Sequence, residues 1–297
     1  MKIVKSIEEI PKIEGPIALT IGMYDGVHLG HQMILNKLSK LTRKGGSRVV
    51  LTFSNHPSTL FHPNAPVPQI ISLEHRLSLF EKLGIDLVIV LPFDQAFASQ
   101  SYEAFFGHLR TYLPFEHLVV GEDARFGKGR LGGPEQILKL GWHTEYLPKE
   151  SYHKETISSG AIRRHLEARD LKKVKKMLGR PYSIFLPFDK GNVIRENEVQ
   201  YKWVTGMEKL CLLPSAVYAV DLYTQGKPIP AIAFYQGNQT INGETELQLT
   251  LYFEKEIPEA DTIDIAFVSY LHDELDPEFQ VSSKASLLES LNPGLPI

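Results

Sequence analysis

The stretch from Ile17 to His31 restricts the fold of this 297-residue chain more than any other segment. It begins with an apolar run, is interrupted by Gly22 and Gly26, and continues into a helix-like segment that has His28 and His31 near its start. A strand, a glycine-rich turn and a helix in this order are typical of phosphate sites, because the first N–H groups of a helix lack partners within the helix and face the positive end of its dipole. Two histidines three positions apart share one face of a helix. The segment therefore predicts a sheet whose carboxyl edge binds a phosphorylated ligand.

The composition indicates a water-soluble protein of two domains. Its 43% hydrophobic residues are enough to fill two ordinary cores. The net charge of −3 argues against binding to nucleic acid through the overall field. The single cysteine, Cys211, excludes a disulfide framework and a cysteine-rich metal site, and it favours a reducing, cytoplasmic setting. No signal peptide is expected, and no apolar run approaches the roughly 18 residues that a membrane span requires.

The first half of the chain alternates between strand-like and helix-like segments, which predicts a parallel sheet with helices on both faces. Apolar residues recur at helical spacing from Leu73 to Leu83 and again from Tyr102 to Leu109. An open sheet of this kind binds ligands beyond the carboxyl ends of its strands. The expected strands cover residues 17–24, 48–53, 87–93, 117–122 and 143–147.

Polar side chains follow two of these strands and are candidates for ligand contacts. Asn55 and His56 come after the second strand and lead into a proline-rich run over residues 57–68. A stiff surface loop is the alternative interpretation of this segment. Asp123 and Arg125 follow the strand over 117–122, and we expect them to meet Asn55 and His56 at one edge.

The loop after residue 122 combines an acceptor, a cation and an aromatic ring in Asp123, Arg125 and Phe126. These groups together suit a nucleotide or an isoalloxazine ring, although a solvated basic turn explains the glycines and lysines equally well. Further on, Ser158 or Ser159 is expected to cap a helix, and Arg163 follows one turn later. A helix start with two hydroxyls and an arginine can hold the β- and γ-phosphates of a nucleotide.

The two histidines also raise the possibility of a zinc site. Zinc requires a third and usually a fourth ligand, and neither a cysteine nor another histidine lies at a familiar distance from His28 and His31. The phosphate interpretation therefore takes precedence.

After residue 182 the pattern changes to short strands with a period of two. Apolar residues alternate with polar ones over 247–253 and 263–267, and similar runs cover 217–223 and 229–235. These runs predict a small antiparallel barrel, closed by a terminal helix over about 284–291.

Four sequence elements resemble those of one family. His28-Leu-Gly-His31 after a Gly-x-(Phe/Tyr)-Asp strand end is similar to the signature of the nucleotidyltransferase superfamily. The segments 52–57, 121–129 and 157–163 resemble, respectively, the Thr-Phe-x-Pro-His-Pro, Gly-x-Asp-Phe-Arg-Phe-Gly-x-Gly and Ile-Ser-Ser-x-x-Ile-Arg elements of prokaryotic FAD synthetases. In that family an FMN adenylyltransferase domain precedes a riboflavin kinase domain.

The resemblance implies that this chain transfers AMP from ATP to FMN and releases pyrophosphate, with magnesium accompanying ATP. It divides the chain into an adenylyltransferase domain, residues 1–182, and a riboflavin-kinase-like domain, residues 183–297. ATP and FMN are the implied small-molecule partners; neither nucleic acid nor a membrane is implied, and the oligomeric state stays open. The implied catalytic residues are His28, His31, Ser159 and Arg163; the implied ATP-binding residues are Gly22, Tyr24, Asp25, Gly30, Ser158, Ser159 and Arg163; the implied flavin-binding residues are Asn55, His56, Asp123, Arg125 and Phe126.

The second half departs from the kinase pattern that the resemblance implies. The marker Gly-x-Pro-Thr-Ala-Asn is missing, and residues 202–207 occupy roughly its place. Glu246 is a candidate for the kinase carboxylate, but alignment on Phe253 places Leu247 at that position. A primary hydroxyl must lose its proton to attack phosphorus, so a missing base argues against kinase activity. A bifunctional enzyme and a non-catalytic flavin sensor remain the alternatives to a monofunctional adenylyltransferase.

Overall fold

The computed structural model describes residues 1–42, 45–187, 193–195, 198–205, 210–224, 227–239, 245–253, 258 and 260–273. The chain forms two compact units. The first contains Met1–Val67 and Leu73–Ser158, and the second contains Pro68–Ser72 and Ser159–Ile297. Each unit is described by itself below.

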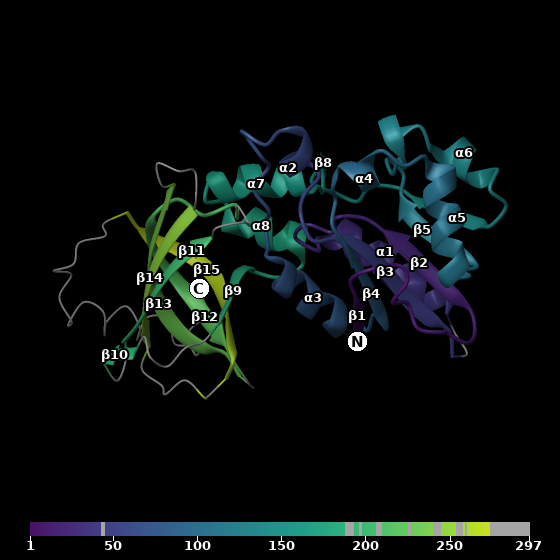
Figure 1. Ribbon diagram of the computed structural model, residues 1–297. Coiled ribbons are helices and arrows are strands. Elements are labelled where there is room, and N and C mark those ends of the chain that lie inside the picture. Colours follow the sequence, from purple (N-terminus) through teal and green to yellow (C-terminus); the bar gives the residue numbers. More distant parts are fainter. Residues whose placement is uncertain are drawn as a thin grey trace. The chain divides into compact units, whose positions relative to one another are not determined.

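The first unit is built on a parallel sheet of six strands in the order β1-β4-β3-β2-β5-β6 (Figure 1). All five strands expected from the sequence are present, whereas β1 was not expected. The chain extends the sheet from β2 toward β4 on one side and from β5 to β6 on the other, which places a topological switch point between β2 and β5. The strands are β1 (Lys2–Val4), β2 (Ile17–Ile21), β3 (Ser47–Phe53), β4 (Leu87–Leu91), β5 (His117–Gly121) and β6 (His143–Leu147).

Helices cover both faces of this sheet, and the period of two in the strands decides which side chains meet them. Alternate strand residues such as Leu19, Leu51 and Ile89 share a core cluster with Phe106 and Ile137, which lie on α5 and α6. The intervening residues face the other way, toward α1 and α3. Burial on both faces explains the apolar runs that predicted β2, β3, β4 and β5, whereas β6 is only partly buried. The helical segments are α1 (Leu29–Leu41), α2 (Ser58–Phe61), α3 (Leu73–Lys82), α4 (Gln95–Ala98), α5 (Tyr102–Tyr112), the 3₁₀ turn η1 (Lys128–Arg130) and α6 (Pro134–Leu138).

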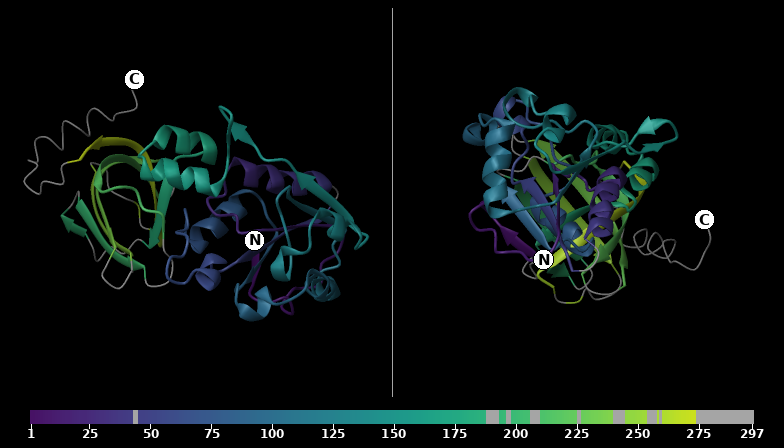
Figure 2. Two further views of the ribbon diagram at one scale, coloured as in Figure 1. Left: turned by 90° about the horizontal axis from the view of Figure 1, so that it is seen from above. Right: turned by 90° about the vertical axis from the view of Figure 1, so that its right-hand side faces the viewer.

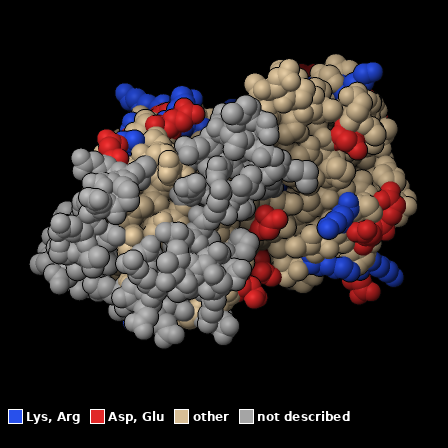
Figure 3. All heavy atoms as spheres, turned by 60° about the vertical axis from the view of Figure 1, so that its left-hand side comes forward, with Lys and Arg blue, Asp and Glu red and all other residues tan. Residues whose placement is uncertain are grey.

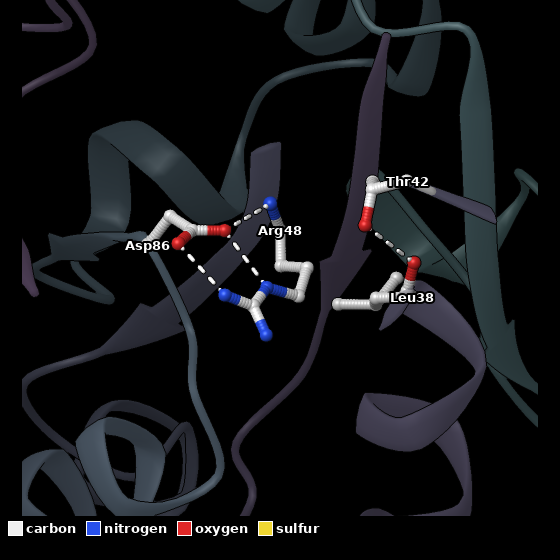
Figure 4. A network of polar contacts seen from close by, with 4 residues as sticks. All are labelled: Leu38, Thr42, Arg48 and Asp86. Atoms are coloured by element: carbon white, nitrogen blue, oxygen red, sulfur yellow. Dashed lines mark hydrogen bonds and ion pairs between the residues drawn. The ribbon is translucent and has the colours of Figure 1, made fainter. Parts of the chain in front are cut away.

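An ion pair fastens the amino ends of β3 and β4 (Figure 4). The Arg48 guanidinium donates from Nε and Nη2 to the two carboxylate oxygens of Asp86 at 2.8 and 2.9 Å, and the Arg48 backbone N–H donates to the same carboxylate at 2.9 Å. Nearby, the Thr42 hydroxyl donates to the Leu38 carbonyl at 3.0 Å where α1 ends. These contacts lie at the edge opposite the carboxyl ends, so they stabilise the sheet away from the candidate site.

Among its described residues, the second unit contains an antiparallel, strongly curved sheet and two helices (Figures 1 and 2). Its seven strands lie in the order β10-β11-β14-β13-β12-β15-β9, and α8 packs on β9 and β15. The elements are α7 (Ser159–Glu167), α8 (Leu171–Leu178), β9 (Tyr182–Pro187), β10 (Val193–Arg195), β11 (Glu198–Thr205), β12 (Ala216–Tyr223), β13 (Ile229–Gln239), β14 (Thr245–Phe253) and β15 (Thr262–His272).

The short segment Pro68–Ser72 belongs to the second unit although it lies far from the other residues of that unit in sequence. Gln69 forms a parallel bridge with Leu210, and the Cys211 N–H donates to the Gln69 carbonyl at 2.7 Å. Ile70 and Ile71 are buried. The chain therefore enters the second unit, leaves it, and returns at Ser159.

The expected fold class, a Rossmann-like sheet followed by a small antiparallel β domain, is confirmed. The terminal helix expected over 284–291 lies outside the described residues. The expected domain boundary at residues 182 and 183 stays a prediction, since the compact units divide after Ser158 and group α7 and α8 with the antiparallel sheet.

Candidate active site

The histidine turn, defined here as residues 22–31, connects β2 to α1 at the switch point. Its backbone adopts left-handed conformations at Tyr24, Gly26 and Val27, with φ of 54°, 81° and 41°. Tyrosine and valine rarely adopt such angles, and strain of this kind persists only where surrounding contacts enforce it. The sharp turn brings both histidines to the carboxyl edge directly after the strand ends at Ile21.

His28 caps α1 with its own ring. Its Nδ1 accepts a hydrogen bond from the His31 backbone N–H at 3.3 Å. An accepting Nδ1 carries no proton, so the proton of the neutral His28 imidazole sits on Nε2. The cap therefore fixes the tautomer and leaves Nε2 as a hydrogen-bond donor at the start of the helix.

The two imidazoles stack on each other, with ring centroids 3.6 Å apart and an angle of 17° between their planes. The Tyr24 ring packs edge-on against His31, and its hydroxyl contacts the Thr20 hydroxyl. Burial, together with the positive charge that His28 and Arg76 can carry, holds the pKa of His31 well below its ordinary value. His31 is consequently neutral at pH 7, and its imidazole can still offer an N–H donor beside His28.

Because Gly30 and Gly22 have no side chains, they leave room for the rings of His28 and Tyr24, respectively. A Cβ on Gly30 would approach Cε1 and Nδ1 of His28 to 3.3 Å, and a Cβ on Gly22 would approach the Tyr24 ring to 3.1 Å. Both distances are tighter than ordinary van der Waals contacts. Asp25, which we expected to bind ATP, is buried at 2% exposure.

The Asn-His-Pro segment, residues 54–57, is held by its own side chains. Asn55 completes an extension of the sheet: its Oδ1 accepts from the Phe93 N–H at 2.8 Å, while its Nδ2 donates to the Phe93 carbonyl and to the Thr59 hydroxyl, both at 3.0 Å. His56 accepts at Nδ1 from the Ser58 N–H at 3.1 Å. Asn55 thus joins the carboxyl ends of β3 and β4, and His56 lies beside the resulting junction.

An aromatic cluster at the same junction was missed by the sequence reasoning. Phe93 packs against Phe53, Phe61 and Phe97, with ring centroids 5.3 to 6.0 Å apart. Phe61 is 58% exposed, so the cluster extends from the core to the surface. The signal was available, because phenylalanines end two of the expected strands, residues 48–53 and 87–93.

The loop over residues 123–130 divides the three residues that we grouped. Asp123 pairs with Lys149 at 2.8 Å, and Arg125 is exposed and donates to the Ala124 carbonyl at 2.8 Å. Phe126 instead lies in the core, where its ring packs against Phe106 at 5.1 Å. Asp123 and Arg125 are therefore exposed, whereas Phe126 anchors the loop that carries them; that the two polar residues bind the flavin stays a prediction.

The remaining candidates lie where the chain passes from one unit to the other. Ser158 ends the first unit, and α7 begins at Ser159, which places Ser158 directly before the helix as we expected of a cap. The Arg163 Nε donates to the Pro68 carbonyl at 2.7 Å. Because Ser159 and Arg163 belong to the second unit, their predicted contact with the phosphates of ATP stays a prediction.

The described residues include no group of three or more histidine, cysteine, aspartate or glutamate side chains arranged to hold a metal ion. A magnesium ion that arrives with ATP would therefore depend on phosphate oxygens and water for most of its ligands.

Basic and acidic side chains are interspersed among the described residues of the face drawn in Figure 3. Among the described helices, none is both long and apolar enough to cross a membrane.

Residues 10–161 match the sequence model of the FAD synthetase family, a match that covers just over half of the chain. The chain belongs to the FAD synthetase family. Of its relatives, the bifunctional riboflavin kinase/FMN adenylyltransferase of Buchnera aphidicola subsp. Schizaphis graminum is 30% identical over 234 residues, which cover 75% of this chain and 73% of the relative. The protein of the same name from Escherichia coli K12 is 29% identical over 257 residues, 82% of this chain and 80% of the relative.

The similarity to other FAD synthetases extends beyond the first unit. An alignment that covers 82% of the chain necessarily reaches into its second half. In fold, the chain also resembles a solved structure described as a macrolide-efflux protein from Streptococcus pneumoniae, with a TM-score of 0.78, 21% identity, and coverage of 97% of this chain and 96% of that one. The family predicted from the four sequence elements is confirmed.

Proposed function

We propose that this FAD synthetase transfers the AMP group of ATP to FMN and releases pyrophosphate. An oxygen of the FMN phosphate attacks the α-phosphorus, the new P–O–P bond forms, and the bond from the α-phosphorus to the bridging oxygen of the β-phosphate breaks. The FMN phosphate is already ionised near neutral pH, so no general base is required. Catalysis then consists of placing the two phosphates and stabilising the charge that develops between them.

The observation that carries this proposal is the stacked histidine pair at the start of α1, in which burial keeps the His31 pKa low. In the proposed mechanism, His28 and His31 donate hydrogen bonds to oxygens of the α-phosphate, where charge develops. Ser158, Ser159 and Arg163 hold the leaving pyrophosphate, and magnesium, bound mainly by the phosphates, neutralises part of their charge. Gly22, Tyr24, Asp25 and Gly30 shape the turn around the nucleotide.

For the flavin, we propose a site at the junction of β3 and β4. His56 and the exposed phenylalanine Phe61 flank it, and Asp123 and Arg125 contribute polar contacts from the neighbouring loop. Asn55 acts by joining the strand ends, because both of its amide hydrogens already have partners. We place the reaction in the cytoplasm, where ATP and a reduced Cys211 are both maintained.

The decisive experiment incubates the full-length protein with ATP and magnesium plus either FMN or riboflavin, and identifies the products by chromatography. We expect FAD from FMN and no FMN from riboflavin, because the second half lacks the kinase marker. FMN formed from riboflavin would establish a bifunctional enzyme like the relatives. The absence of any product would favour a flavin-binding sensor.

A variant tests the assigned role of the histidines. His31→Ala removes one donor to the developing charge, and loss of such a donor typically lowers the rate by about a hundred- to a thousand-fold. We expect the variant to fold, to bind FMN nearly as the wild type does, and to form FAD at least about tenfold more slowly. An unchanged turnover number would contradict the role.

A further inference from the structure

Arg76 is a buried cation that the proposed mechanism has not used. It lies in the first turn of α3, and only 1% of its surface is exposed. A buried guanidinium is costly unless its N–H groups find acceptors, so its partners show what the fold gains by keeping it. Two backbone carbonyls supply them in the first unit. Nη1 donates to the Met23 carbonyl, and Nη2 donates to the Phe53 carbonyl at 2.7 Å.

One carbonyl lies within the histidine turn, and the other lies directly before the Asn-His-Pro segment; we assign these two segments to the two substrates. Met23 lies in the histidine turn directly before Tyr24, where the backbone becomes left-handed. Phe53 is the last residue of β3 and directly precedes the Asn-His-Pro segment. The Thr52 hydroxyl also donates to the Met23 carbonyl, at 3.3 Å. The planar Arg76 side chain, with its fixed donor geometry, therefore connects the histidine turn to the start of the Asn-His-Pro segment.

The same helix also supports the rings of the turn. Phe80, one turn beyond Arg76 on α3, packs edge-on against Tyr24 at 5.6 Å, and Tyr24 packs edge-on against His31 at 4.9 Å. The charge of Arg76 is one of the causes that hold the pKa of His31 low, after burial and His28. The packing of α3 and the charge of Arg76 thus both act on His31, one of the proposed hydrogen-bond donors.

We propose that Arg76 is a positioning residue for adenylyl transfer, whose two-pronged contact fixes the histidine turn relative to the Asn-His-Pro segment. It touches neither substrate; it acts by setting the distance between the segments that hold them. The inference rests on the proposed function and adds a residue that none of the four family-like elements contains. Displacement of reacting groups by about 1 Å can lower a rate about a hundredfold, so a residue that sets this distance controls catalysis.

The test compares three variants. Arg76→Met removes both the contact and the charge, while Arg76→Lys keeps the charge but cannot reproduce the planar fork. Arg48→Met is the matched control, because Arg48 also forms a two-pronged contact but at the opposite end of β3. The measurements are the turnover number and KM for FMN, FMN binding without ATP by flavin fluorescence, and the titration of the His31 ring by NMR.

We expect Arg76→Met to lower the turnover number about tenfold or more and to raise the KM for FMN. We also expect the His31 ring, which faces Tyr24, His28 and Arg76, to titrate at higher pH in this variant. Arg76→Lys should keep the low titration point of His31 and lose turnover. This result would separate the positioning effect of the guanidinium from the effect of its charge. Arg48→Met should lower the melting temperature alone. Wild-type turnover and wild-type His31 titration in a folded Arg76→Met variant would overturn the proposal.

A second route applies if Arg76→Met does not fold. Thr52→Val removes the other donor to the Met23 carbonyl and leaves a residue of similar size, so a loss of turnover in Thr52→Val and Arg76→Lys supports the proposal, and wild-type turnover in both overturns it. The FMN binding and His31 titration require no ATP. They report on Arg76 even if the wild-type protein forms no FAD, so failure of this inference is distinguishable from failure of the proposed function.

Discussion

At the scale of single residues, the candidate site depends on close contacts that hold the His28 ring on several sides. His28 caps the helix that it begins, stacks on His31, and lies against the space where Gly30 has no side chain. Such a ring cannot move without breaking a contact. Small substitutions here should therefore affect activity and stability in different ways.

Gly30→Ala should separate these two effects. The added Cβ would lie 3.3 Å from two atoms of the His28 ring, so the ring must shift. In the helix itself alanine is favoured over glycine by about 1 kcal/mol. We expect FAD formation to fall at least about tenfold while the melting temperature stays level or rises.

Gly107→Ala is the control for this change. Gly107 lies in α5, and a Cβ there meets nothing within 4 Å. We expect a gain of about 0.5 to 1 kcal/mol in the free energy of unfolding and unchanged turnover. Equal turnover in both variants would show that the closeness of Gly30 to His28 has no catalytic importance.

His31 should make the protein less stable in mild acid. Its pKa is lowered in the folded state, so the folded state binds fewer protons than the unfolded state near and below pH 6.5. Stability should accordingly fall as the pH drops through about 6.5, by at most about 1.4 kcal/mol per pH unit from this residue. We expect urea unfolding of His31→Gln to lose less stability than the wild type between pH 7 and 5.5. Parallel curves would contradict this.

At the scale of elements, a side chain at the end of β3 replaces backbone hydrogen bonds of the sheet. Asn55 accepts from and donates to the backbone of Phe93, as a further residue of β3 would. The pairing of β3 and β4 is thereby extended beyond the strand ends. The Asn-His-Pro segment therefore begins at a junction held by three hydrogen bonds that join the Asn55 side chain to Phe93 and Thr59.

Asn55→Ala should weaken this junction. The change leaves the Phe93 N–H and carbonyl without their side-chain partners, at a cost of about 1 to 3 kcal/mol in the free energy of unfolding. We also expect a higher KM for FMN and a nearly unchanged KM for ATP. Chemical denaturation and steady-state kinetics provide the two measurements.

Gln95→Ala serves as its control, because Gln95 is exposed and its amide donates to the exposed Ser99 hydroxyl at 3.3 Å. Surface changes of this kind usually alter stability by less than about 0.5 kcal/mol. A KM for FMN that stays at the wild-type value in Asn55→Ala would contradict the proposed flavin site.

Sequence patterns predicted β2, β3, β4 and β5 because the central residues of these strands are buried and read as apolar runs. They also predicted β6, although its residues are only partly buried. They did not predict β1, whose three residues are mostly exposed and are held by pairing with β4. Motifs at strand ends located the histidine turn correctly within the sheet. Phe126 carried the expected aromatic character, but whether a ring faces core or ligand depends on packing that no local pattern encodes. Arg76 escaped notice because its partners are backbone carbonyls, which have no sequence signature.

At the scale of the whole molecule, the compact units do not follow the expected functional domains. Residues 159–182 carry phosphate-binding candidates, yet α7 and α8 group with the antiparallel sheet. Val174 and Met177 of α8 are fully buried. A fragment that ends at the expected boundary would retain α8 but lose the sheet on which it packs.

We therefore expect the fragment 1–182 to be unstable. Its α8 would expose Val174 and Met177, and the segment Pro68–Ser72 would lose Leu210, with which Gln69 pairs. Compared with the full chain, the fragment should melt at lower temperature, bind a hydrophobic dye and self-associate in gel filtration. A monomeric fragment with the melting temperature of the full chain would instead establish residue 182 as an autonomous domain boundary.

The route of the chain through the second unit bears on how such a protein can change over generations. Pro68–Ser72 crosses into the second unit between two parts of the first, and Gln69 is paired there with Leu210. A gene truncated before this pairing partner would still encode the crossing segment, whose buried isoleucines Ile70 and Ile71 would be left uncovered. This structural role keeps the second half under selection, whether or not it carries a catalytic activity of its own. Its framework is expected to persist as long as the first half is needed.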